Sequence, residues 1–162
     1  MSQEHDLLLI TGIPGTGKTC YGDKFATDFG FVHYDLEDQQ ALSRFTTFAQ
    51  LIIELLSLNK SVIVTWGFNP EDPSSLELIR QLREAGFKMI WFDGNRPAAL
   101  RAFRRRGTVS EGALVAQMER IERSTIVERL KPTVINSFDD RGQFKPTKEL
   151  LAEIRASLSL GQ

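Results

Sequence analysis

The sequence predicts an α/β fold in which helices cover both faces of a five-stranded parallel sheet, within a single domain spanning residues 1–162. Short apolar runs alternate along the chain with longer amphipathic segments, which is the pattern of repeated strand–helix–strand units. The runs at residues 7–10 and 62–64 are apolar at every position. Such strands are expected where a parallel sheet is buried on both faces.

The predicted strands are residues 7–11, 31–34, 61–65, 87–92 and 133–136. Between them, apolar residues recur three or four positions apart, which is typical of helices that pack one side against a core. The predicted core-facing stripes are Ala41, Phe45, Phe48, Ile52 and Leu55; Leu76, Ile79 and Leu82; Leu114, Met118 and Ile121; and Leu150, Ile154 and Leu158.

Two helix starts have recognisable signals. Asp72 precedes Pro73, which combines a capping side chain with a proline at the first helical position. Thr108 and Glu111 have the spacing of a capping box. Because no repeat or long linker interrupts this pattern, we expect one domain.

Composition narrows the possible functions. The net charge of −1 gives no overall attraction to nucleic acid or to an anionic membrane. Cys20 is the only cysteine, so no intrachain disulfide can form. The apolar run at residues 7–10 is too short for a signal peptide or a membrane span. We therefore expect a cytoplasmic protein, in which neither Cys20 nor His33 belongs to a recognisable ligand or catalytic pattern.

One loop carries the strongest chemical signal, because it matches the pattern G-x-x-x-x-G-K-[ST] at every specified position. Its residues are Gly12, Ile13, Pro14, Gly15, Thr16, Gly17, Lys18 and Thr19. It follows a predicted strand and opens a helix whose apolar residues Tyr21, Phe25 and Phe29 are four apart.

Each residue type in this loop suits the binding of a triphosphate. Glycines bring backbone N–H groups close to phosphate oxygens, and the helix N-terminus favours an anion. Lys18 is expected to bridge the β- and γ-phosphates, and the Thr19 hydroxyl to bind Mg²⁺. The sequence therefore predicts a site for ATP and Mg²⁺.

This form of the loop, in a chain of this length, resembles the small P-loop kinases. The group includes nucleoside monophosphate kinases, shikimate kinases, gluconate kinases and the polynucleotide-kinase-like proteins. The resemblance covers most of the chain as an order of elements, although only the loop is specific by sequence. It implies a three-layer P-loop NTPase fold with a short arginine-bearing lid, and transfer of the γ-phosphate of ATP to a small hydroxyl- or phosphate-bearing acceptor.

The resemblance also implies a catalytic or metal-binding carboxylate after the second strand. Among Asp35, Glu37 and Asp38 we favour Asp35 for both roles, because it ends the strand, where open α/β sheets bind ligands. Asp93, at the end of the fourth strand, is the second candidate for the metal. A solvated acidic turn that caps the next helix is the alternative for the first group.

The run from Arg101 to Arg106 occupies the place of the lid. Arg101 and Arg105 share one helical face and are the favoured phosphate contacts, while Arg104 is a candidate to stack on adenine. A solvated basic helix end is the alternative. The resemblance further implies that the loop after the last strand edges the adenine, which makes Ser137 and Phe138 candidates.

The acceptor is not assigned by matching, because the third strand is followed by Trp66-Gly67-Phe68-Asn69, without the triple glycine of shikimate kinases. Trp66, Phe68 and Trp91 either line an acceptor pocket or belong to the core. Two other functions remain open: a polynucleotide 5′-hydroxyl kinase, suggested by the basic cluster, and a regulatory NTPase without an acceptor, suggested by Asp93. A monomer and a homodimer are equally compatible with the sequence.

Overall fold

The computed structural model describes residues 4–37, 47–94, 96–106 and 111–160. Its centre is a five-stranded sheet with the strand order β2-β3-β1-β4-β5, and all neighbouring strands are parallel. The strands are β1 (Leu7–Gly12), β2 (Val32–Asp35), β3 (Val62–Thr65), β4 (Lys88–Asp93) and β5 (Thr133–Asn136). The predicted strands are confirmed, with their ends shifted by no more than one residue.

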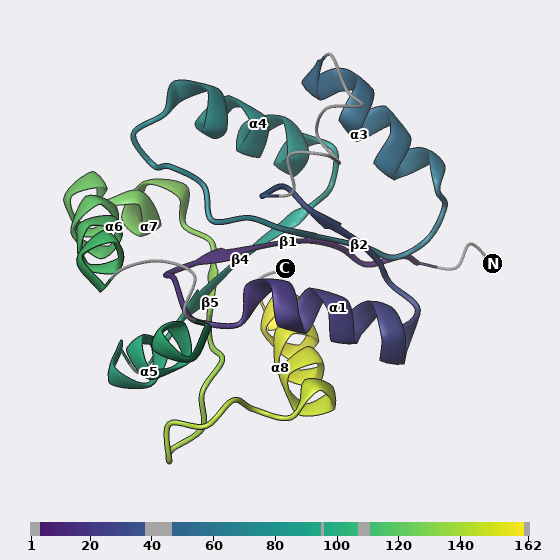
Figure 1. Ribbon diagram of the computed structural model, residues 1–162. Helices are drawn as coiled ribbons and strands as arrows, with labels where there is room; N and C mark the ends of the chain where they lie inside the picture. The colour runs from purple at the N-terminus through teal and green to yellow at the C-terminus, as the bar shows by residue number, and fades with distance from the viewer. Residues whose placement is uncertain (1–3, 38–46, 95, 107–110, 161–162) are drawn as a thin grey trace.

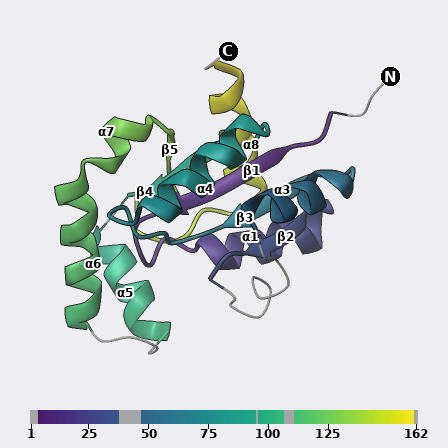
Figure 2. The ribbon, with the colours of Figure 1, turned by 90° about the horizontal axis from the view of Figure 1, so that it is seen from above.

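Helices cover both faces of the sheet, as predicted (Figure 1). The helices are α1 (Lys18–Phe29), α3 (Phe48–Ser57), α4 (Pro73–Glu84), α5 (Arg96–Arg106), α6 (Glu111–Ser124), α7 (Ile126–Leu130) and α8 (Thr147–Leu160). Helices α1 and α8 lie on one face, and α3 and α4 lie on the other. Helices α5 and α6 lie beside the carboxyl end of β1, where the glycine-rich loop begins (Figure 2).

The central strand β1 shows why its residues are apolar at successive positions. Leu8 and Ile10 pack in the same cluster as Phe25 of α1, whereas Leu9 packs with Ile79 of α4. Successive side chains of a strand point to opposite faces, so a strand covered on both sides needs apolar residues throughout.

Most of the predicted helix stripes face the core. Their buried members are Ile79, Leu82, Leu114, Leu150, Ile154 and Leu55, and their partly buried members are Leu76, Met118, Ile121, Leu158 and Ile52. Asp72 caps α4 as predicted, since its side chain accepts a hydrogen bond from the Ser74 N–H at 3.1 Å. The Thr108–Glu111 capping box falls outside the described residues, because Thr108 is not described.

One aromatic residue, Phe48, was wrongly predicted to be core. Phe48 is 36% exposed, and the buried residues of α3 are Leu51 and Leu55. Since α3 is apolar around most of its circumference, the spacing alone could not select its buried face. Phe29 is 38% exposed on the last turn of α1, where its ring meets that of Phe25. Ala41 and Phe45 lie outside the described residues.

Across the described ranges, no helix is both long enough and apolar enough to cross a membrane.

Replacing Ile90 with alanine is expected to lower the free energy of unfolding by about 2–5 kcal/mol, because the residue is fully buried in β4 and its loss leaves a cavity. Urea unfolding measures this change. Ile53→Ala is the control: Ile53 is 67% exposed on α3, so the expected change is within about 0.5 kcal/mol. Equal effects of the two substitutions would contradict the assignment of the core.

Candidate nucleotide-binding site

The glycine-rich loop connects β1 to α1 and packs closely against two other elements. A Cβ atom on Gly12 would lie 2.2 Å from the Phe92 carbonyl oxygen of β4, and one on Gly15 would lie 2.3 Å from the Ala99 carbonyl oxygen of α5. Both glycines also have positive φ, at 137° and 79°. A side chain at either position would force the backbone out of this arrangement. The loop is therefore a tightly held turn at the start of a helix, as a phosphate-binding site requires.

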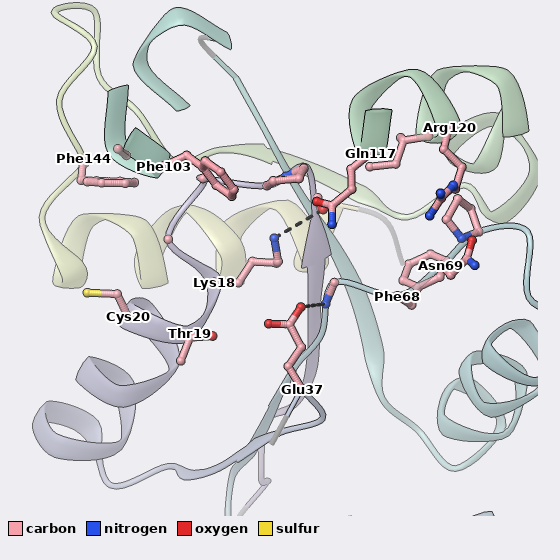
Figure 3. Close-up of a pocket in the computed structure, with 18 of the residues that line it drawn as sticks. Lys18, Thr19, Cys20, Glu37, Phe68, Asn69, Phe103, Gln117, Arg120 and Phe144 are labelled. Carbon is pink, nitrogen blue, oxygen red and sulfur yellow. Dashed lines mark hydrogen bonds between the residues drawn. The ribbon is translucent and has the colours of Figure 1, made fainter. Parts of the chain in front are cut away.

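Lys18 lies over this turn. Its Nζ donates hydrogen bonds to the carbonyl oxygens of Ile13, at 3.0 Å, and Gly12, at 3.4 Å (Figure 3). Thr16 is buried, and its hydroxyl donates to the Ile13 carbonyl at 2.8 Å, so it supports the loop from inside. The ammonium group is thus held at the mouth of the loop, where a phosphate oxygen could replace a backbone carbonyl as its partner.

Thr19 and Asp35 lie side by side at the base of the loop. The Thr19 hydroxyl donates to Asp35 Oδ2 at 3.2 Å, and Asp35 Oδ1 accepts from the Glu37 N–H at 3.0 Å. Oxygen ligands of this kind suit Mg²⁺, which usually takes one or two protein side chains and completes its shell with phosphates and water. The described residues contain no group of three or more His, Cys, Asp or Glu side chains that could hold a metal by themselves. This pair therefore fits a magnesium ion that is shared with a nucleotide.

Asp93, the second metal candidate, lies elsewhere. It ends β4 in register with Asn136 of β5, and it is not among the residues that line the pocket beside the loop.

That pocket has a volume of about 740 Å³ and extends away from the loop in two directions. Its lining outside the loop comes from Cys20, Asp23, Glu37, Gly67, Phe68, Asn69, Pro70, Ala102, Phe103, Gln117, Arg120, Ile121 and Phe144. Figure 3 shows Phe144 and Phe68 at opposite ends, with Lys18 between them. The loop thus divides the cavity into an end beside Phe144 and an end beside Phe68 and Arg120.

Of the acids after β2, Glu37 is the one that faces the cavity. Its Oε1 accepts a hydrogen bond from the Gly67 N–H at 2.9 Å, and its side chain lines the pocket opposite Lys18 (Figure 3). Asp35 does not line the pocket, because its two oxygens are turned toward Thr19 and the backbone of the same turn. Asp38 lies outside the described residues. The sequence placed both acids in one turn, but it could not show which one points inward.

The structure places the predicted lid arginines away from the cavity. Arg101, Arg104 and Arg105 are exposed on α5, and the residues of α5 that line the pocket are Ala102 and Phe103. The lid was expected on the run from Arg101 to Arg106, and the segment 107–110 that follows it lies outside the described residues.

Arg120 of α6 is the arginine that lines the pocket, with its guanidinium 3.9 Å from a Glu71 carboxylate oxygen. Sequence reasoning missed Arg120, because a single arginine in an amphipathic helix carries no motif.

The loop after β5 supports the phosphate loop and places an aromatic ring beside it. Ser137 is buried, and its hydroxyl donates to the Thr16 carbonyl oxygen at 2.9 Å. Phe138 is also buried and stacks on Phe144, with ring centroids 4.6 Å apart. Phe144 itself is 42% exposed and lines the pocket. The two predicted adenine contacts thus form the support, and the ring that faces the cavity is Phe144.

Tyr21 ties this loop to α1. Its hydroxyl lies 2.7 Å from the Lys145 carbonyl oxygen and 3.3 Å from that of Ser137, and it donates to them. Burial raises the pKa of the Tyr21 phenol well above its usual value, so the group stays protonated and remains a donor. Its ring also meets the edge of Phe144, with centroids 6.0 Å apart.

The aromatic residues at the other end divide between pocket and core. Phe68 lines the cavity, Trp91 is buried in the core, and Trp66 is partly buried against Phe68. Of the three, only Phe68 faces the cavity.

The sheet order and the loop define a P-loop nucleotide-binding fold. Similar solved structures include a shikimate kinase from Bacteroides thetaiotaomicron, with a TM-score of 0.60 and 18% identity over 95% of this chain and 98% of that chain. A tunicamycin resistance protein of Deinococcus radiodurans gives 0.63 and 18% over 96% of both chains. A gluconokinase from Sinorhizobium meliloti 1021 gives 0.53 and 17% over 95% and 91%.

The chain therefore has the fold of the small P-loop kinases, and the expected resemblance is confirmed at the level of the fold. No protein-family model and no curated protein matches the sequence.

Replacing Tyr21 with phenylalanine is expected to lower the free energy of unfolding by about 1–3 kcal/mol, because the partly buried Lys145 carbonyl oxygen and the buried Ser137 carbonyl oxygen lose this donor. Tyr34→Phe is the control, since the Tyr34 hydroxyl makes no hydrogen bond to another described residue. Urea unfolding compares the two variants. A loss for Tyr34→Phe as large as that for Tyr21→Phe would argue against this anchor.

Proposed function

We propose that this protein is an ATP-dependent phosphotransferase that moves the γ-phosphate of ATP to a small hydroxyl- or phosphate-bearing acceptor. One observation carries the proposal: a single pocket has the phosphate loop and Lys18 at its centre, an exposed aromatic ring at one end, and an acid with an arginine at the other. The likeness of the fold to kinases of small molecules supports it.

ATP would lie along the loop with its base toward Phe144. The loop N–H groups and Lys18 bind the triphosphate, and the exposed face of Phe144 offers a stacking surface. Thr19 and Asp35 would hold Mg²⁺, which would supply positive charge against the phosphates of the nucleotide. Asp93 is the less favoured metal residue, because it lies outside the pocket lining.

The acceptor would bind between Glu37 and Arg120. Glu37 takes the proton from the acceptor hydroxyl as its oxygen attacks the γ-phosphorus, and the bond to the β,γ-bridging oxygen breaks to release ADP. Arg120 and Gln117 suit an acceptor with an anionic or polar substituent, and Phe68 provides an apolar wall. An acceptor that carries both a hydroxyl and an anionic group fits these residues best.

Arg101 and Arg105 remain proposed phosphate contacts, and Arg104 a proposed adenine contact, in the nucleotide-bound state. Their helix already borders the pocket through Ala102 and Phe103, so these long side chains start one or two residues from the cavity wall.

Lys18→Ala is expected to weaken triphosphate binding by about 100-fold or more, because a charge-assisted contact to the β- and γ-phosphates is lost. Lys24→Ala is the matched control on the same helix, since Lys24 is exposed and lies outside the pocket lining. Isothermal calorimetry with an ATP analogue and Mg²⁺ measures both variants. Unchanged binding in Lys18→Ala, or no binding by the wild-type protein, would refute the proposed function.

Glu37→Gln is expected to lower kcat by about 100- to 10,000-fold while nucleotide affinity is retained, since only the proton acceptor is removed. Asp35→Asn should instead raise the Mg²⁺ concentration needed for half-maximal activity and also lower the rate. Phosphoryl transfer from radiolabelled ATP to a panel of hydroxylated carboxylates and sugar phosphates measures these rates. Normal transfer by Glu37→Gln would remove its assigned role, and ATP hydrolysis that is independent of every acceptor would favour a regulatory NTPase.

A further inference from the structure

We propose that His33 is a positioning residue for the metal site, because it joins α1 to the ends of β2 and β3 and so keeps Thr19 and Asp35 together. The inference rests on the proposed function, and it concerns a residue without any motif.

The His33 ring is fixed at both nitrogens. Nδ1 lies 2.8 Å from Asp23 Oδ1, and Nε2 lies 2.7 Å from the Thr65 hydroxyl. The side chain is only 8% exposed. Rotation of the ring would break both contacts and leave polar atoms buried without partners, which is costly. His33 therefore holds Asp23 and Thr65 at a set distance from each other.

The Asp23–His33 contact lies about one helical turn along α1 from the Thr19–Asp35 pair. Asp23 comes four residues after Thr19, so the two share one face of α1. His33 comes two residues before Asp35, so these two share one face of β2. The Asp23–His33 and Thr19–Asp35 contacts are consequently successive links between the same helix and the same strand.

Thr65 extends the link to the turn that carries the acids. It is buried at the end of β3, opposite Asp35 in the parallel register. Its carbonyl oxygen accepts a hydrogen bond from the N–H of Leu36, the residue after Asp35, at 3.0 Å. A shift of the His33 ring would therefore disturb both sides of the metal pair: α1 through Asp23, and the acidic turn through Thr65.

Gly22 shows how closely the ring approaches the helix. A Cβ atom at this position would lie 2.5 Å from His33 Nε2. A glycine inside a helix costs about 1 kcal/mol relative to alanine. The glycine at position 22 offsets this cost by leaving space for the His33 ring between α1 and the sheet, where the ring reaches Thr65.

Loss of His33 is expected to affect metal binding and phosphate binding differently. The loop N–H groups and Lys18 bind phosphates without help from His33, whereas a metal with only two protein ligands depends on their separation. Loss of His33 should thus weaken metal binding and leave metal-free nucleotide binding intact.

The test compares His33→Ala with wild type and with Asp28→Ala, an exposed control on the same helix. Binding of a fluorescent, non-hydrolysable ATP analogue is measured in EDTA and during Mn²⁺ titration, and electron paramagnetic resonance follows bound Mn²⁺. For His33→Ala, the Mn²⁺ concentration at half-saturation should rise about 10-fold or more, with metal-free affinity unchanged. Asp28→Ala should match wild type in both measurements.

Asp23→Ala provides a second variant should His33→Ala fail to fold, because the Asp23 side chain is 71% exposed. Asp23 also lines the pocket, so the Mn²⁺ requirement of this variant is compared with its own metal-free affinity. The Mn²⁺ requirement should again rise. An unchanged Mn²⁺ requirement in the folded variants, or an equal loss of metal-free affinity, overturns the positioning role. Failure of the wild-type protein to bind the analogue would instead refute the proposed function itself.

Discussion

The close approach of the phosphate loop to β4 and α5 is the constraint on which the rest of the site depends. Gly12 meets the backbone of Phe92, and Gly15 meets the backbone of Ala99, at distances that exclude any side chain. This packing fixes the loop at the start of α1 before any ligand arrives. Binding of a polyphosphate would therefore not carry the conformational entropy cost of ordering the loop.

Helix α1 connects several parts of the site to this loop. Lys18 lies over the loop, Thr19 meets Asp35, and Tyr21 anchors the segment that bears Phe144. One turn further, Asp23 meets His33. Because these residues point in different directions from one helix, α1 contributes to the Phe144 end of the pocket and to the Thr19–Asp35 pair through separate contacts.

The pocket combines a rigid centre with ends that come from other elements. The phosphate loop is held between the sheet and α5, whereas the acceptor end is assembled from the turn with Glu37, the segment after β3, and α6. This division suits a kinase fold that serves different acceptors, since the end beside Phe68 and Arg120 can vary while the donor site is preserved. The choice of acceptor in this chain would then be made by a small number of side chains at that end.

The sequence by itself determined the strands and the phosphate loop, because both are local features. A buried parallel strand needs a continuous apolar run, and the loop needs its glycines, Lys18 and Thr19 at fixed spacing. Only the tertiary structure decided that Glu37 faces the cavity while Asp35 meets Thr19, and that the arginine lining the pocket is Arg120 rather than Arg101 or Arg105. Side-chain direction at a turn, and the helix that borders a cavity, depend on packing between segments far apart in the chain, and no local pattern records that packing.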